Sequence, residues 1–151
     1  MQHRGISLQK NDQENFNNIS EKLGKLSTDF SNNVLDATKK WFLILNKKSE
    51  VDGLPERVLE LMAISAHNHL KKDEEVDIKN GPWKLSLDIP TYTSFMTYAT
   101  DRNLREKLYK AFVGRASQGE KNNSQIIEEI LSLRTKQANL CLLYTSPSPR
   151  D

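Results

Sequence analysis

A long amphipathic pattern occupies the N-terminal part of the chain. Eight apolar residues recur there at intervals of three and four positions: Phe16, Ile19, Leu23, Leu26, Phe30, Val34, Ala37 and Trp41. These intervals match the 3.6-residue period of an α-helix, so they predict one amphipathic helix of about 30 residues. Asn11 and Glu14 have the spacing of a capping box and predict where the helix starts. We expect the apolar stripe to pack in a helical bundle.

Two short apolar segments have the pattern of strands. Residues 41–45 form a solid apolar run that is too short for another helix. Residues 84–89 alternate strictly, with Leu85, Leu87 and Ile89 on one face, as in a half-buried strand. We predict that these strands pair in antiparallel fashion. An isolated two-stranded ribbon is only marginally stable, so we expect its apolar face to pack on the long helix.

Helical periodicity returns in four further places. The first of these helices follows Pro55 and is inserted between the strands, and the second follows Pro90, which ends the strand. Asp101 and Ser124 are predicted to cap the last two helices. The predicted apolar positions of the four helices are Val58, Leu59, Met62, Ala63 and Ala66; Tyr92, Phe95, Met96 and Ala99; Leu104, Leu108, Ala111 and Phe112; and Ile126, Ile127, Ile130 and Leu131. The last helix also carries Arg134. The predicted fold class is mainly α, a helical lobe with one long amphipathic helix and a small antiparallel two-stranded ribbon.

Composition and charge narrow the classes of protein that fit. Hydrophobic residues make up 36% of the 151 positions and charged residues 28%, which is polar for a self-contained globular domain. The net charge of +2 is spread along the chain without a basic cluster, which argues against a nucleic-acid partner. No apolar run reaches the roughly 20 residues of a membrane span, and the first residues lack the apolar core of a signal peptide. We therefore expect a soluble protein of the cytoplasm or of an organellar matrix or stroma, neither secreted nor bound to a membrane.

Residues 141–151 differ from the rest of the chain. Their sequence, C-L-L-Y-T-S-P-S-P-R-D, closely resembles the translated read-through of a sequencing-library adapter. Pro147 and Pro149 exclude a continuing helix. We predict that the tail is artefactual and disordered, with a natural Ser/Pro tail as the alternative. The only cysteine, Cys141, lies in this tail, so an internal disulfide is excluded.

Several segments, taken in order and spacing, resemble one enzyme family. They are F-S-N-N-V-L-D-A-T at residues 30–38, L-S-L-D-I-P at 85–90, M-T-Y-A at 96–99, L-R-E-K-L-Y-K-A-F at 104–112, R-A-S at 115–117 and N-S-Q-I-I-E-E-I-L-S-L-R at 123–134. Residues 5–140 are therefore similar to part of an oligopeptidase A-type member of the thimet oligopeptidase family of zinc metallopeptidases. The resemblance implies a mostly helical peptidase of two lobes around a narrow channel that admits short peptides. It also implies that this chain is a partial, non-catalytic lobe whose partner, the catalytic lobe with its zinc, is missing here.

The zinc motif of that family, H-E-x-x-H, is absent from the chain. In this motif two histidines one helical turn apart bind zinc, and the glutamate activates a bound water. The histidines present are His3, His67 and His69, and the last two lie about 200° apart on a helix, so they cannot chelate one ion from a regular turn. We therefore predict no catalytic and no metal-binding residue in this chain and no zinc bound to it. Its substrate-binding residues are unknown, and by itself it is expected to be inactive.

Other polar residues have structural explanations. Adjacent residues diverge on a helix, so the pairs Glu74-Glu75 and Glu128-Glu129 are expected to be solvated charges. Asp36 and Arg134 interrupt apolar neighbourhoods, and a buried charge needs a partner, so we expect inter-helix hydrogen bonds or ion pairs for them. Three tyrosines are expected to pack at the rim of the fold: Tyr92, Tyr98 and Tyr109.

Two functions stay open at the level of the sequence. The preferred one is a fragment of a zinc-dependent metalloendopeptidase that hydrolyses short peptides. The alternative is a stand-alone helical interaction module without catalysis, because the stripe from Phe16 to Trp41 also suits a partner helix. A monomeric chain that melts cooperatively by itself would favour the module.

Overall fold

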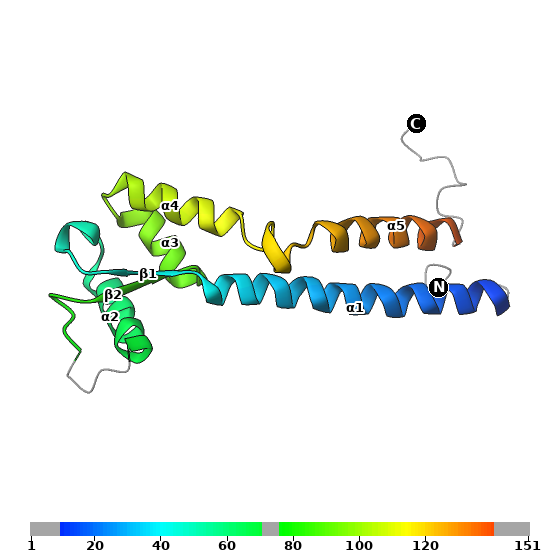
Figure 1. Ribbon diagram of the computed structural model, residues 1–151, viewed down its shortest axis with the longest axis horizontal. Helices are drawn as coiled ribbons and strands as arrows, with labels where there is room; N and C mark the ends of the chain where they lie inside the picture. The colour runs from blue at the N-terminus through cyan, green and yellow to red at the C-terminus, as the bar shows by residue number, and fades with distance from the viewer. Residues whose placement is uncertain (1–9, 71–75, 141–151) are drawn as a thin grey trace. The chain divides into compact units, whose positions relative to one another are not determined.

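The computed structural model describes residues 10–70 and 76–140 (Figure 1). It is a mainly α fold with one small antiparallel sheet, as the sequence pattern predicts. The elements in chain order are α1 (Lys10–Lys40), β1 (Phe42–Leu45), the 3-10 helix η2 (Lys48–Glu50), α2 (Glu56–Leu70), β2 (Trp83–Ser86), α3 (Ile89–Tyr98), α4 (Arg102–Val113), the 3-10 helix η3 (Gly119–Lys121) and α5 (Ser124–Leu140). None of the helices within the described ranges combines the length and the apolar character of a membrane span.

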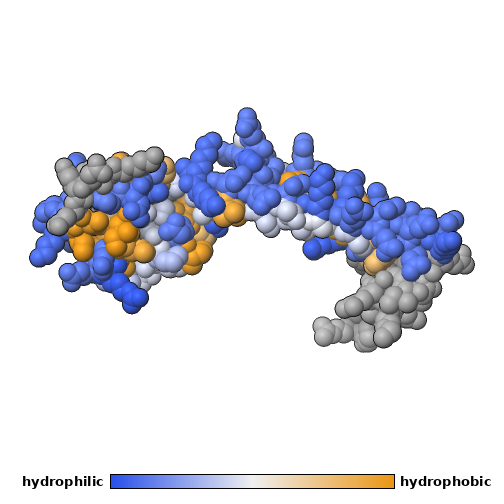
Figure 2. Space-filling view, turned by 90° about the horizontal axis from the view of Figure 1, so that it is seen from below, coloured by the Kyte–Doolittle hydropathy of each residue, from blue (hydrophilic) through white to orange (hydrophobic). Residues whose placement is uncertain are grey.

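The chain divides into two compact units. Among the described residues, the first unit comprises residues 10–33 and 119–140, and the second unit comprises residues 34–70 and 76–118. In Figure 2 apolar surface gathers over the second unit, whereas the visible surface of the described part of the first unit is mostly hydrophilic. The two units therefore differ in how much apolar surface they show in this view.

Helix α1 follows the predicted period, but its apolar stripe is only partly covered. The eight residues of the stripe, from Phe16 to Trp41, are all half-buried, and α1 itself contains no fully buried residue. Asn11 already lies inside the helix, so its predicted role as the capping residue before the first turn is wrong. Apolar surface along α1 thus stays accessible for further contacts.

Gly24 lies in the middle of α1, where a Cβ atom built on its backbone meets no atom within 4 Å. Glycine in a helix interior costs about 0.5–1 kcal/mol relative to alanine, because its backbone loses more freedom on folding. We expect Gly24→Ala to stabilise the chain by about 0.5–1 kcal/mol in urea unfolding followed by far-UV circular dichroism. Gly24→Pro is the opposite control, and a lower unfolding free energy for the alanine variant would contradict a regular helix at this position.

Strands β1 and β2 form the predicted antiparallel ribbon. The register pairs Phe42 with Ser86, Leu43 with Leu85, Ile44 with Lys84 and Leu45 with Trp83. The second strand ends at Ser86 rather than at Ile89, which instead begins α3 with an exposed side chain. Pro90 therefore lies in the first turn of α3, where its missing N–H has no helical partner to lose.

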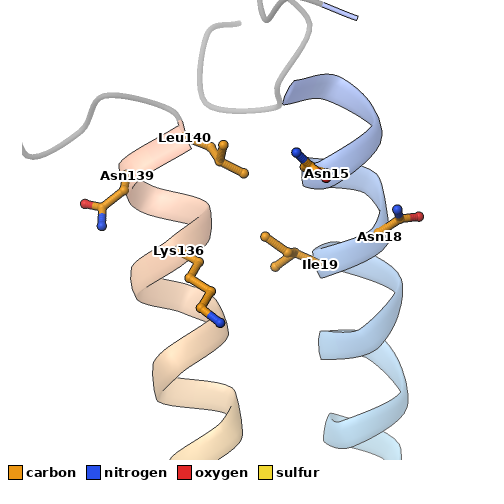
Figure 3. A pocket seen from close by; sticks show the side chains of 6 residues that line it. All are labelled: Asn15, Asn18, Ile19, Lys136, Asn139 and Leu140. Carbon is orange, nitrogen blue, oxygen red and sulfur yellow. The ribbon is translucent and has the colours of Figure 1, made fainter. Parts of the chain in front are cut away.

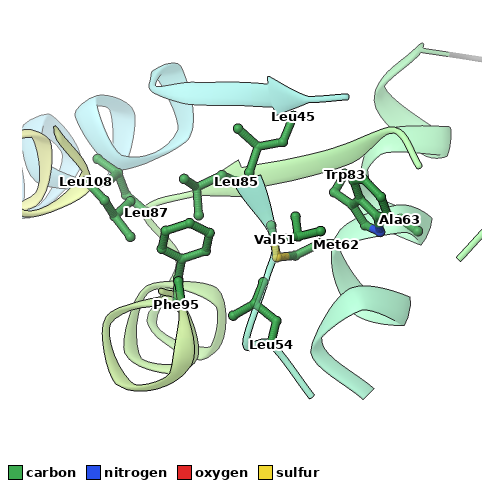
Figure 4. Packing of buried hydrophobic residues seen from close by; sticks show 11 residues of the cluster. Leu45, Val51, Leu54, Met62, Ala63, Trp83, Leu85, Leu87, Phe95 and Leu108 are labelled. Carbon is green, nitrogen blue, oxygen red and sulfur yellow. The ribbon is translucent and has the colours of Figure 1, made fainter. Parts of the chain in front are cut away.

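The hydrophobic core lies in the second unit and joins the ribbon to α2, α3 and α4 (Figure 4). Its members are Leu45, Val51, Leu54, Met62, Ala63, Trp83, Leu85, Leu87, Phe95, Ala99 and Leu108. Strand β2 contacts α2 and α3, so the expectation that the ribbon packs on α1 is wrong. The physical reason is that α2, inserted between the strands, turns Met62, Ala63 and Ala66 towards the ribbon and covers it locally.

Candidate functional site

Polar side chains join α1 and α5, which lie side by side and antiparallel in the first unit (Figure 1). Asn123, only 3% exposed, donates from Nδ2 to the carbonyl oxygen of Phe30 (3.1 Å) and accepts at Oδ1 from Nδ2 of Asn33 (2.8 Å). Towards the other end of α5, Nε2 of Gln137 donates to Oγ of Ser20 (2.8 Å). A buried amide must keep its hydrogen-bond partners, so these bonds fix the register of the two helices.

The start of α5 differs in one detail from the predicted cap. Ser124 does not bond to the free N–H groups of the helix; its Oγ donates to Oδ1 of Asn122 (2.8 Å). The same oxygen of Asn122 accepts from the backbone N–H of Ser124 (2.9 Å). The predicted cap at Asp101, by contrast, is confirmed, because its carboxylate accepts from the backbone N–H groups of Asn103 and Leu104.

A groove of about 490 Å³ lies between the N-terminal turns of α1 and the last turns of α5 (Figure 3). Ile19 and Leu140 point towards each other across this groove, while Asn18 and Asn139 point away. Its lining within the described residues consists of Asn15, Asn18, Ile19, Lys136, Asn139 and Leu140. Because this set holds no carboxylate, imidazole, hydroxyl or thiol, the groove suits packing and amide hydrogen bonds and does not suit peptide hydrolysis.

The described histidines do not assemble into a metal site. The ring of His69 packs edge-on against Phe42, with centroids 4.3 Å apart and planes at 62°, so it does not lie free at the helix end. His67 is half-buried on the same helix, and His3 lies outside the described residues. Within residues 10–70 and 76–140 no group of three histidine, cysteine, aspartate or glutamate side chains could hold a metal ion. Zinc, which takes three or four protein ligands, does not fit this part of the chain.

The glutamate pairs behave as surface charges where they are described. Glu129 forms an ion pair with Lys22 (2.8 Å), and both side chains are substantially exposed. Such pairs contribute only about 0–1 kcal/mol. Glu128 is exposed beside it, and Glu74 and Glu75 lie outside the described residues. Glu128 and Glu129 thus fit the expectation of solvated surface charges.

The expectation that Asp36 and Arg134 sit in apolar surroundings is wrong, since both side chains are exposed. Asp36 nevertheless takes part in an interaction with another group, so its exposure does not overturn the expectation that it has a partner. The fully buried residue of α5 is Leu133, and on a helix Arg134 is turned away from it by about 100°. The exposed position of Arg134 leaves its charge accessible to water.

An aromatic stack involves one of the three tyrosines that the sequence singles out. Tyr92 stacks on Phe112, with ring centroids 3.8 Å apart and planes 15° from parallel. The guanidinium of Arg115 lies over the same Phe112 ring, with its Cζ 3.6 Å from the ring centroid. Its Nε donates to the carbonyl oxygen of Phe112 (2.8 Å), and its Nη1 donates to Oγ1 of Thr38 (3.2 Å). Arg115 thus connects the end of α4 to α1 through hydrogen bonds. In the sequence, only its place in the R-A-S segment points to this residue. Two further tyrosines are about half exposed: Tyr98 and Tyr109.

Two carboxyl groups have lowered pKa values, and both causes are local. Hydrogen bonds from the side chain and backbone of Asn80 lower the pKa of Asp77, in the turn before β2. A hydrogen bond from the ammonium of Lys110, one turn along α4, lowers the pKa of Glu106. A lowered pKa keeps a carboxylate ionised at neutral pH, which is the opposite of what a general acid needs.

Comparison with known sequences matches residues 95–145 to the sequence model of Peptidase family M3. The matched stretch begins within α3 and includes all of α4 and α5. The α1–α5 pair and the Asp101 cap therefore involve residues that the family model describes, while the ribbon lies outside that match.

The similarity to individual proteins extends over most of the chain. Over 136 residues, 90% of the chain, it is 45% identical to organellar oligopeptidase A, chloroplastic/mitochondrial, of Arabidopsis thaliana and 44% identical to probable cytosolic oligopeptidase A of the same plant. Over 141 aligned residues it is 38% identical to oligopeptidase A of Haemophilus influenzae. These alignments cover 17%, 19% and 19% of the three relatives. The chain thus spans less than a fifth of the length of the curated relatives it matches.

Proposed function

This chain is an oligopeptidase A-like member of the thimet oligopeptidase family, and from that premise we propose that it forms part of a zinc-dependent metalloendopeptidase that hydrolyses short peptides. The observation that carries the proposal is the ordered identity of 45% over 90% of the chain. The relatives' names describe oligopeptidases, which supports short peptides as the class of substrate. The longer enzyme, rather than this segment alone, performs the reaction.

Within that enzyme the segment supports the fold and does not carry out the chemistry. Zinc in a peptidase polarises the scissile carbonyl and lowers the pKa of a bound water. The chain has no H-E-x-x-H motif, and its described residues offer no group of three metal ligands. The zinc ligands and the general base therefore belong to residues outside this segment, which is a partial helical lobe of the enzyme.

The relatives also support a proposal for the compartment of the protein and for the residues that belong to the peptidase. One relative is an organellar protein and another a probable cytosolic protein, which supports the cytoplasm or an organellar matrix or stroma. We take residues 5–140 as the segment that belongs to the peptidase. Residues 141–151 lie outside the described residues. We propose that they are translated adapter sequence and do not belong to the enzyme.

Peptidase activity separates this proposal from the interaction module. We expect the 151-residue chain to leave a quenched fluorescent peptide of about ten residues uncut, with or without added zinc, because it lacks the ligands that make a zinc-bound water a nucleophile. A chimaera in which residues 10–140 replace the matched segment of a full-length oligopeptidase A relative is expected to cut the peptide. Its activity should be lost on chelation and restored by zinc.

The unmodified relative is the control for the assay. Hydrolysis by the 151-residue chain at the rate of the chimaera would contradict the proposed division of labour. A folded but inactive chimaera would remove the claim that the segment belongs to a working peptidase, and would leave the helical interaction module as the better account.

A further inference from the structure

Helix α5 carries apolar residues on two flanks, and only one of them faces α1. The residues on the flank towards α1 are buried or half-buried, and they are Ile126, Ile130, Leu133 and Leu140. The second flank holds Ile127 and Leu131, whose side chains are 44% and 59% exposed. At about 100° per residue these two lie about 40° apart, and Ala138 falls between them. The sequence pattern predicts a single face that includes Ile127 and Leu131, but the structure divides that face into a covered and an uncovered half.

A helix with apolar residues on two sides is typical of a position between two neighbours. The hydrogen bonds of Asn123 and Gln137 fix how α5 lies on α1. A rotation of α5 that buried Ile127 and Leu131 against α1 would break those bonds and expose Leu133. The uncovered flank therefore needs a different neighbour.

We propose that the flank of α5 formed by Ile127, Leu131 and Ala138 is the docking surface for the remaining polypeptide of the same oligopeptidase. The partner is expected to present an apolar helix or strand face. Arg134 lies on this flank and is exposed, so a carbonyl or carboxylate oxygen at the edge of the partner surface would complete the contact. The inference rests on the proposed function, since it takes its partner from the same enzyme.

Two observations favour this partner over a second copy of the chain. The match to the peptidase family runs through the whole of α5, so α5 belongs to the part of the sequence that the family shares. More than four-fifths of each compared relative lies outside the aligned segment, so the longer enzyme contains ample chain to cover this flank. A homodimer would instead need one self-complementary patch, and Ile127 and Leu131 make a small one.

Cysteine alkylation measures the covering of this flank directly. Leu131→Cys is introduced into the 151-residue chain, with Cys141→Ser, and into the chimaera in which residues 10–140 replace the matched segment of a full-length relative. The rate of reaction with iodoacetamide is followed by mass spectrometry of the peptide that holds residue 131. We expect the chimaera to react about tenfold or more slowly than the chain, because thiol reactivity falls with exposure. Ser132→Cys is the matched control; Ser132 is exposed, and its direction lies away from both α1 and the proposed partner, so its rate should differ by less than about twofold.

Each result bears on the inference separately from the proposed function. Equal rates at residue 131 in chain and chimaera would overturn the docking surface, even where the chimaera cuts peptide. Protection at residue 131 in a chimaera that does not cut peptide would support the docking surface and overturn the proposed function. Protection that appears in the chain alone and grows with its concentration would assign the flank to a second copy. A chimaera that does not fold would also count against the inference, because a matching surface is what its fold requires.

Discussion

Replacing Phe95 by alanine is expected to destabilise the second unit by about 3–5 kcal/mol. Phe95 lies on α3 with none of its surface exposed, and Figure 4 shows its ring beneath Leu85 and Leu87. Alanine would remove the buried ring and leave a cavity among side chains that the ribbon holds in place. Urea unfolding followed by tryptophan fluorescence measures the loss, because both tryptophans of the chain, Trp41 and Trp83, lie in this unit.

Tyr98→Ala on the same helix is the control. Tyr98 is 52% exposed, so its truncation should cost less than about 1 kcal/mol. The conservative variant Phe95→Leu keeps most of the buried volume and is expected to cost about 1–2 kcal/mol, which keeps the series measurable if the alanine variant is largely unfolded. Similar losses of unfolding free energy for Phe95→Ala and Tyr98→Ala would contradict the position of Phe95 in a core shared by the ribbon, α2 and α3.

The elements of this fold were predictable because their apolar periods are long and regular. The stripe from Phe16 to Trp41 specifies one helix, and the alternation around Leu85 and Leu87 specifies a strand with a buried face, where both side chains are indeed buried. Pro90 marks the limit of this reasoning, since proline ends a strand and also suits the first turn of a helix. Periodicity alone could not separate a strand that stops at Pro90 from a helix that begins at Ile89.

The pairing of elements was less predictable than their existence. An apolar residue shows that a partner is needed but does not identify the partner. The pattern therefore predicts that the ribbon packs on α1, whereas α2 and α3 cover it. For the same reason the pattern predicts Ile127 and Leu131 on the packed face of α5, whereas the structure leaves both side chains exposed. The buried amide of Asn123 gives no periodic signal, because its burial depends on Phe30 and Asn33, some 90 residues away in sequence.

For the candidate site, the sequence shows directly only whether a short motif is present. A motif such as H-E-x-x-H is defined by residue type and spacing, so its absence can be read directly. Arg115, by contrast, is recognisable only when Phe112 and Thr38 are brought to it by the fold. Chemistry that depends on short spacings is visible in a sequence, whereas contacts between distant helices are not.

Gly53→Ala is expected to destabilise the second unit by about 2–5 kcal/mol. Gly53 has a φ of +85°, and a Cβ atom built there collides with the carbonyl oxygen of Tyr98 and comes within 3.1 Å of Cγ2 of Thr100. The approach is close because Thr100 is bonded to Asp52: its backbone N–H donates to the carbonyl oxygen (3.1 Å) and its Oγ1 to Oδ2 (2.9 Å). Alanine must push the turn away from the end of α3 and break these bonds, which urea unfolding followed by tryptophan fluorescence will record.

Gly119→Ala is the matched control, because it isolates the backbone strain from the collision. Gly119 also has a left-handed φ, +70°, but a Cβ atom built there meets no atom within 4 Å. Its replacement should therefore cost only the left-handed strain of about 1–2 kcal/mol, measured for both variants by far-UV circular dichroism. An equal or smaller loss of unfolding free energy for Gly53→Ala than for Gly119→Ala would contradict the close contact of the turn with Tyr98. The connection between η2 and α2 would then lie farther from α3 than these contacts indicate.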